Sequence, residues 1–173
     1  FVAKPGWVHQ AYKIGVPMGG DLPSGAAGKA PSFVIQAVKD PLSGNLDRVQ
    51  VVKVYLENGK QAEKIFDVAW SGGRTIDPAN GKLPAVGTTV DLKTGKWDNS
   101  IGASELSTVW TDPTFKADQA AVYYVRVLEI PTPRWSTLRA IEFGLPLPKD
   151  VSPTIQQRGW SSPIWYTPAR SRS

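Results

Sequence analysis

The sequence predicts a mainly β protein: an antiparallel β-sandwich, immunoglobulin-like or jelly-roll-like, with one short helix and long loops. Three observations predict this fold class. Several segments of about ten residues are rich in β-branched and aromatic side chains, which is typical of strands. Clusters of glycine, proline, asparagine and aspartate separate these segments, and the chain contains 16 Gly and 15 Pro. Only one segment has a clear helical pattern with a glycine at its end.

The amino-terminal part of the chain differs from the rest. Residues 1–31 are predicted to form a loop-rich arm, because residues 15–25 consist largely of residues that break regular structure. A short helix over 8–14 is compatible with this arm. Residues 32–173 are predicted to form a single β-sandwich domain, since the turn clusters are spread evenly and mark no linker. Its first strand is expected at 32–39, a β-branched and aromatic run.

The clearest local signal is Asn58-Gly59, which lies between two strand-like segments at 47–56 and 61–70. Both central residues of a type I′ turn have positive φ, which Asn and Gly tolerate, so these strands are predicted to form a hairpin. The first strand alternates, with Val49, Val52 and Val54 as its apolar residues after a local slip at Val51-Val52. On the second strand, the side chains predicted to face the core are those of Phe66, Val68 and Trp70.

The middle of the chain has weaker signals. Residues 88–93 form a strand-like run that turns at Thr94-Gly95 toward residues 96–100, which predicts a second hairpin. Residues 103–110 fit either a short helix or a strand.

The last third contains the second strong element. Residues 121–130 carry apolar bulk on both faces, which predicts a central strand covered on both sides. Pro131 and Pro133 are expected to end it, because proline cannot donate to the sheet ladder. The one helix is predicted at 136–143, followed by a proline-rich connection and a short final strand at 164–166.

The residue counts exclude several classes of chemistry. The chain has no Cys and a single His, His9, so it contains no disulfide, no Cys nucleophile and no site with two His ligands. A Ser-His-Asp triad requires His9. We therefore predict no catalytic residue and no cofactor in this chain, while its status as an enzyme stays open.

The balance of charged residues indicates which kinds of partner the chain could bind. The chain has 20 Lys and Arg against 15 Asp and Glu, a formal net charge of +5. The basic residues are scattered and form no long run, which favours a solvated surface over nucleic-acid binding. No stretch approaches the roughly 20 apolar residues of a membrane span.

Two patterns suggest binding sites, and each has a simpler alternative. Asp40 and Asp47 flank a turn with Ser43 and Asn45 between them, which makes them weak calcium candidates. Turn residues that bond their own backbone explain the same pattern more simply. The seven Trp are spread along the chain, so an exposed subset suits a carbohydrate platform or a partner-binding patch. Packing in the core and at the sheet edges is the favoured alternative.

Four longer phrases support a resemblance to a family. They are residues 15–23 (GVPMGGDLP), 45–53 (NLDRVQVVK), 123–135 (YYVRVLEIPTPRW) and 155–168 (IQQRGWSSPIWYTP). In these phrases the chain resembles the carboxyl-terminal part of a bacterial family known as domain of unknown function 3604. The resemblance covers nearly the whole chain. It implies a secreted, periplasmic or outer-envelope protein whose amino-terminal part resembles a metal-dependent phosphoesterase of the polymerase-and-histidinol-phosphatase (PHP) type.

Two functional hypotheses follow from the resemblance. In the first, the chain is a non-catalytic module of that larger protein, and its partner is the missing upstream metal-binding domain. Asp21, Arg134 and Trp135 are then candidates for the rim of a ligand or active site, with Arg134 suited to holding an anion. In the second, the chain is a processed, stand-alone structural, binding or assembly subunit that acts on other protein chains or as a homo-oligomer. A start at Phe1 is compatible with both a processed product and a fragment.

Overall fold

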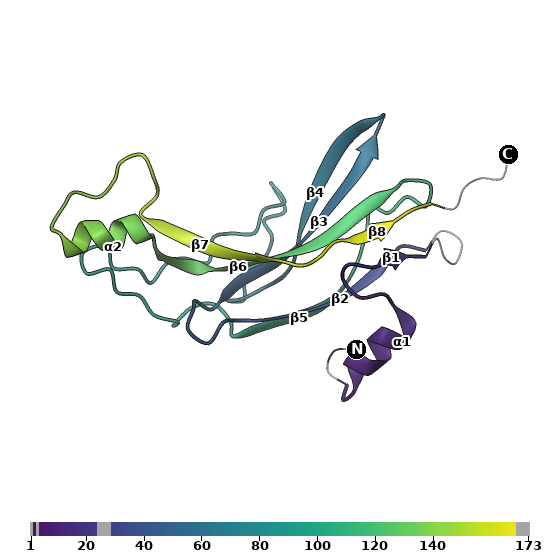
Figure 1. Cartoon of the computed structure of the whole chain (residues 1–173), viewed down its shortest axis with the longest axis horizontal. Helices are drawn as coiled ribbons and strands as arrows, with labels where there is room; N and C mark the ends of the chain where they lie inside the picture. Colours follow the sequence, from purple (N-terminus) through teal and green to yellow (C-terminus); the bar gives the residue numbers. More distant parts are fainter. Residues whose placement is uncertain (1, 3, 24–28, 169–173) are drawn as a thin grey trace.

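The computed structural model describes residues 2, 4–23 and 29–168 (Figure 1). Over these residues the fold is mainly β with two helices: the one that was predicted, and a second where a short helix over 8–14 was compatible with the arm. The elements in chain order are α1 (Trp7–Ile14), β1 (Asp21–Leu22), β2 (Ser32–Val38), β3 (Leu46–Glu57), β4 (Lys60–Trp70), β5 (Glu105–Thr111), β6 (Ala121–Pro133), α2 (Trp135–Glu142), β7 (Thr154–Trp160) and β8 (Ile164–Tyr166).

The strands form two sheets. The large sheet has the order β1-β8-β6-β3-β4, and β7 pairs with β6 further along the edge on which β8 lies. Strands β2 and β5 form a separate two-stranded sheet (Figure 1). All pairings are antiparallel except the short one between β1 and β8, so the predicted antiparallel, mainly β class is confirmed.

The core lies between the two sheets. One group of buried hydrophobic residues comes from both of them: Phe33, Ile35, Leu46, Val49, Val51, Tyr55, Leu106, Ala121, Tyr123 and Tyr166. On β2, and on β3 from Val49 onward, the residues of this core group alternate with residues that point outward, as the two-residue period of a strand requires. The type of sandwich, and the division into an arm over 1–31 and a domain over 32–173, stay predictions.

The predicted hairpin is confirmed, with Asn58 and Gly59 at φ of 52° and 73°. The expected alternation on β3 was wrong, because from Val49 onward the strand alternates with no slip at Val51-Val52. Its core side carries Val49, Val51, Lys53 and Tyr55, of which Val49, Val51 and Tyr55 belong to the buried core group. Two irregularities lie elsewhere. In the pairing with β6, β3 holds one extra residue between Leu46 and Arg48. In the pairing with β4, between Val49 and Gln50, β4 holds one extra residue.

This bulge changes which side chains of β4 face the core. Phe66 packs on Trp110 with ring centroids 5.0 Å apart, and Val68 packs against the core, as predicted. Trp70 lies beyond the bulge, in register with Arg48, and its indole N–H donates to the Arg74 carbonyl at 2.6 Å. One inserted residue reverses the face of everything after it, so the expected inward position of Trp70 was wrong.

The second predicted hairpin does not form. Residues 88–100 contain no strand, because short-range hydrogen bonds hold this segment in turns. The Asp91 carboxylate accepts from the Lys93 N–H and the Thr94 hydroxyl, and Thr89 bonds the backbone of Asp98 in both directions. Further along, the segment 103–110 proves to be a strand, β5, rather than a helix.

Strand β6 extends past its predicted end. Pro131 and Pro133 lie in register with Gln156 and Thr154 of β7, a strand that was not predicted. Beyond Ile130 the residues of β6 pair with β7 and no longer with β3. A proline is tolerated where one side of the strand has no ladder to donate to. The central position of β6 is confirmed, but the second sheet covers only one of its faces.

The helices lie outside the two sheets. Helix α2 confirms the predicted helix at 136–143, and Gly144 has the positive φ of 61° expected at its carboxyl end. Helix α1 has no buried residue and lies away from the large sheet (Figure 1). Neither helix has the length and apolar character that a bilayer crossing requires, among the residues described.

Candidate functional site

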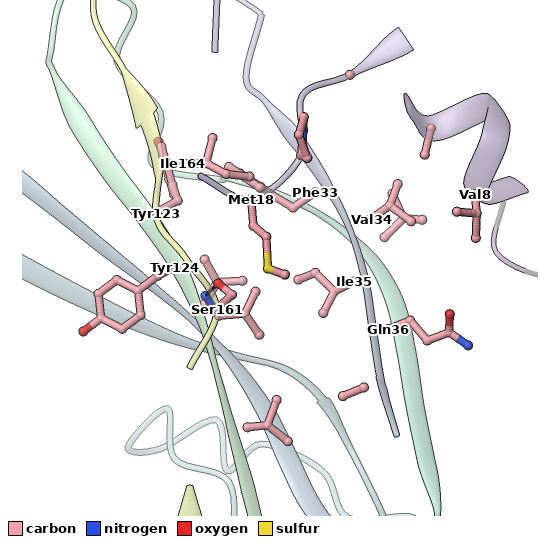
Figure 2. Close-up of a pocket in the computed structure, with 18 of the residues that line it drawn as sticks. Val8, Met18, Phe33, Val34, Ile35, Gln36, Tyr123, Tyr124, Ser161 and Ile164 are labelled. Atoms are coloured by element: carbon pink, nitrogen blue, oxygen red, sulfur yellow. Dashed lines mark hydrogen bonds between the residues drawn. The ribbon is translucent and has the colours of Figure 1, made fainter. Parts of the chain in front are cut away.

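An apolar groove lies between β2, the inner face of β6, and the arm (Figure 2). Its volume is about 990 Å³. Figure 2 shows the Met18 side chain extending into it, with Ile35 of β2 on one side and Ser161 on the other. Valines 125 and 127 line it from β6. A groove lined mainly by aliphatic side chains binds apolar surface, since few polar groups in it could orient a reactive ligand.

The pattern of β2 explains why the rim of this groove is apolar. Phe33 and Ile35 are buried in the core, as alternate residues of a strand with one inner face. The intervening positions include Val34 and Val38, and Val38 keeps 68% of its surface exposed. Across from β2, helix α1 also exposes apolar side chains, those of Val8, Tyr12 and Ile14. Strand β2 and α1 therefore flank the groove with uncovered apolar surface.

A buried ion pair fastens the end of β5 to the large sheet. The Lys53 ammonium donates to Asp112 Oδ2 at 2.6 Å, to the Thr114 carbonyl at 2.9 Å and to the Thr114 hydroxyl at 3.3 Å. The Tyr123 hydroxyl donates to the same Asp112 oxygen at 2.8 Å. Because Lys53 and Asp112 are almost fully buried, each charge depends on the other. We call Lys53, Asp112, Thr114 and Tyr123 the clamp.

The clamp changes the titration of two of its groups. Burial raises the pKa of Asp112, but hydrogen bonds from Lys53, Thr114 and Tyr123 together outweigh burial and leave that pKa below its ordinary value. Burial and the bond to the Asp112 carboxylate raise the pKa of Tyr123. All three ammonium hydrogens have an acceptor, so the geometry is that of a structural link between the sheets rather than of an acid–base pair.

A second network surrounds Asp47 at the start of β3. Its Oδ1 accepts from Arg74 at 2.6 Å, and its Oδ2 accepts from Arg48 at 3.1 Å and from Gln156 at 2.8 Å. Arg74 and Arg48 also donate to the Pro84 carbonyl. These bonds fix the segment that follows β4 against the sheet.

The two calcium candidates lie in different surroundings. Asp40 is exposed, and its Oδ1 accepts from the Leu42 N–H at 2.7 Å, which is the turn geometry given above as the simpler explanation. Asp47 is buried, with both oxygens occupied by the donors just described. The described residues contain no group of three or more His, Cys, Asp or Glu arranged to hold a metal ion.

The three rim candidates are not brought together. Asp21 is exposed in β1, in register with Trp165 of β8. Arg134 and Trp135 lie at the start of α2, at the opposite end of the view in Figure 1. Arg134 Nε donates to the Ser152 carbonyl at 2.9 Å, and the Trp135 ring is 71% exposed. Their shared role at a rim stays a prediction.

Four of the tryptophans show two contrasting environments. Trp110 packs between Phe33 and Phe66, which agrees with the packing interpretation. Trp135, Trp160 and Trp165 are exposed. Sequence reasoning missed the clamp and the exposed pair on β7 and β8. The signal for the clamp was available: a lysine on the same parity as Val49, Val51 and Tyr55 in an otherwise apolar strand.

These features define a mainly β protein with a two-sided core, a structural clamp and an apolar groove. Within that class, the family can be named. A family model described as "Protein of unknown function (DUF3604)" matches residues 1–168, so the chain belongs to this family. This confirms the resemblance found in the sequence. No curated protein and no solved structure matches the chain.

Proposed function

We propose that this chain is a non-catalytic β-rich module of a larger envelope or secreted protein, and that it packs through its groove on a neighbouring domain. The observation that carries the proposal is the groove itself, whose lining is mainly apolar. Apolar surface of this extent is stabilised when another protein surface covers it. The neighbouring domain in this proposal is the upstream one, of the PHP metal-dependent phosphoesterase type, that the family resemblance implies.

The buried charged groups support a structural role for the module. Lys53 and Asp112 hold β5 on the large sheet, and Asp47 holds the segment after β4. If one of these groups gained or lost a proton in a reaction, its partner would be left as an unpaired buried charge. In the same proposal the two sheets form a sandwich of the immunoglobulin-like or jelly-roll-like type, which agrees with a core built from both sheets.

A crosslinking experiment tests the groove. A photoreactive amino acid replaces Met18, which lies in the groove, in the parent protein that contains the upstream domain. We expect a crosslink from this position to the upstream domain. The matched control is the same replacement of Leu92, which is half-exposed in the turn-rich segment outside the groove. Absence of a crosslink from Met18, or equal crosslinking from Leu92, contradicts the proposal.

An activity assay tests the non-catalytic part separately. The 173-residue chain is incubated with p-nitrophenyl phosphate and Mn²⁺ or Zn²⁺, beside the parent protein. We expect hydrolysis by the parent and none above the blank by the chain. Metal-dependent hydrolysis that co-elutes with the chain in gel filtration contradicts the proposal, whatever the crosslinking shows.

A second candidate is a stand-alone structural or assembly subunit, and one observation favours it. Helix α1 is amphipathic in sequence yet exposes Val8, Tyr12 and Ile14, which suits packing on a second copy of the chain. Sedimentation over a range of concentrations distinguishes the candidates. Self-association that Tyr12→Lys abolishes supports an assembly subunit, and a monomer at all concentrations excludes a homo-oligomer.

A further inference from the structure

The face of the large sheet that points away from β2 and β5 has a composition of its own. We call it the open face. Its register places side chains in rows across the strands. One row contains Trp160, Arg126, Gln50 and Asp67, and the row four residues away along β6 contains Trp165, Val122, Val54 and Glu63. Side chains directly opposite one another in a sheet share a face, so both indoles belong to the open face. Trp160 ends β7 and also contributes to the edge of the groove.

Tyr124 lies between the two rows, on β6 itself. Tyr124 is among the residues that line the groove, but Figure 2 shows its ring extending away from Met18. Tyr123 beside it packs instead on Phe33 of β2, with ring centroids 4.8 Å apart. In the row of Tyr124 lies Val52, which has 0% exposure although it faces the open side. The side chains directly opposite Val52 on the flanking strands, Tyr124 and Ile65, are placed to cover it.

The three aromatic residues form a line along β6. Trp160 and Trp165 are opposite positions of β6 that are four residues apart, which corresponds to about 14 Å. Tyr124 lies midway along β6 and one strand to the side, about 8 Å from each. Trp160 is 61% and Trp165 48% exposed. Both indoles stand on strands of the sheet rather than on loops, so their spacing is fixed by backbone hydrogen bonds.

The cations beside Trp160 lack acidic partners. Arg126 is directly opposite Trp160, and Arg158 is two residues before it on β7. Arg126 Nε donates to Gln50 Oε1 at 2.8 Å, and its terminal nitrogens have no partner within the part of the chain that the structure describes. Arg158 has none there either. In contrast, Arg48, Arg74 and Arg139 all form ion pairs.

We propose that the open face binds a linear acidic polysaccharide that carries uronic acid carboxylates. The C–H face of a pyranose ring packs flat on an aromatic side chain and buries apolar surface of both. The line of Trp160, Tyr124 and Trp165 accepts consecutive sugars in this way. Arg126 and Arg158 bind carboxylates at one end of the line, because a guanidinium donates two parallel hydrogen bonds to a carboxylate.

The distribution of charge favours a glycan over a single-stranded nucleic acid. A nucleic acid carries a phosphate at every nucleotide, so its site needs basic side chains along the whole line of stacking residues. Here the row of Trp165 contains two valines and Glu63, and no basic residue. The cations lie at the Trp160 end only. This arrangement suits a chain of stacked rings with carboxylates at one end.

Calorimetry with the 173-residue chain tests the proposal. The probe is an oligogalacturonate of defined length at low salt. We expect saturable binding that weakens about tenfold in Trp160→Ala and in Trp165→Ala, since each removes one stacking contact. Arg158→Ala is expected to weaken binding and to reduce its dependence on salt. The matched control is Trp135→Ala, which removes a still more exposed indole from α2 and should bind as the unchanged chain does.

Two further probes separate stacking from simple charge attraction. Polyacrylate supplies carboxylates without sugar rings, and its binding should be the same in Trp160→Ala as in the unchanged chain. An oligo(dT) of similar length should bind more weakly than the oligogalacturonate at equal salt. The proposal is overturned if no oligogalacturonate binds, if the Trp160 and Trp165 variants bind normally, or if oligo(dT) binds more tightly through the same residues. Unchanged thermal midpoints show that the variants are folded.

Discussion

The two faces of the large sheet use charged side chains in opposite ways. On the covered face, Lys53 lies among apolar side chains and its ammonium is bound entirely by Asp112 and Thr114. On the open face, Arg126 and Arg158 stand beside Trp160 with no acidic partner among the described residues. The difference teaches that a charge in the interior is retained only with a full set of partners, whereas a charge at the surface is free to bind an external group.

The largest expected effect comes from breaking the clamp. Asp112→Ala leaves the buried Lys53 ammonium without its counter-charge, and we expect a loss of about 3–5 kcal/mol in the free energy of unfolding, measured with urea. The matched control is Glu142→Ala, which breaks the exposed pair with Arg139 and should change stability by less than about 0.5 kcal/mol. Equal, small losses in both variants would show that Lys53 reaches water.

Most of the fold could be predicted from the sequence, because local patterns encode strands and turns. Asn58-Gly59 identified the hairpin, and Gly144 marked the end of α2. The bulge opposite Val49 could not be predicted, since one inserted residue in β4 leaves the composition of the strand unchanged. Strand β7 was missed for a related reason. Its polar residues are typical of a loop, and it forms a strand because it pairs with β6.

The candidate sites depend on pairing even more strongly. Nothing in the local sequence connects Lys53 with Asp112, which is 59 residues away, or Trp160 with Arg126. The members of each pair are brought together by the register of the sheets, which the local sequence does not show. The sequence did supply the right question about tryptophan, whether some of the seven were exposed, but only the structure separates Trp110 from Trp160.

The next largest effect tests how tightly the chain is packed where Gly102 meets the start of β3 and the Ile130 side chain of β6. A Cβ atom at this position would lie 2.5 Å from the Asn45 Cβ and 2.7 Å from Ile130 Cγ2, and its φ is +82°. Both crowding and backbone strain oppose a side chain here, so Gly102→Ala should cost about 2–4 kcal/mol. Gly73→Ala, which has positive φ but open space around it, isolates the backbone part. Equal losses in both urea titrations would mean that crowding contributes nothing.

Acid should weaken the clamp by a smaller amount. The pKa of Asp112 is lower in the folded chain than its ordinary value of 3.8, so its contribution is complete above that value and is lost as the pH falls through the folded pKa. The effect is smaller than that of Asp112→Ala because a protonated carboxyl still accepts hydrogen bonds. Urea midpoints measured from pH 6 down to pH 2 should fall less in Asp112→Asn than in the unchanged chain. An identical slope would assign the acid sensitivity to other carboxylates.

The smallest effect on stability is expected for a substitution on the open face of the large sheet. Trp160→Ala should change the free energy of unfolding by less than about 0.5 kcal/mol, because this indole keeps most of its surface in water. Phe33→Ala, which removes a smaller ring from the covered side, should cost about 3–5 kcal/mol, since Phe33 packs on both Trp110 and Tyr123. A large aromatic side chain that contributes little to stability leaves its ring available for a ligand. If Trp160→Ala were as costly as Phe33→Ala, the indole would be packed as core, and the open face would be closed to a polysaccharide.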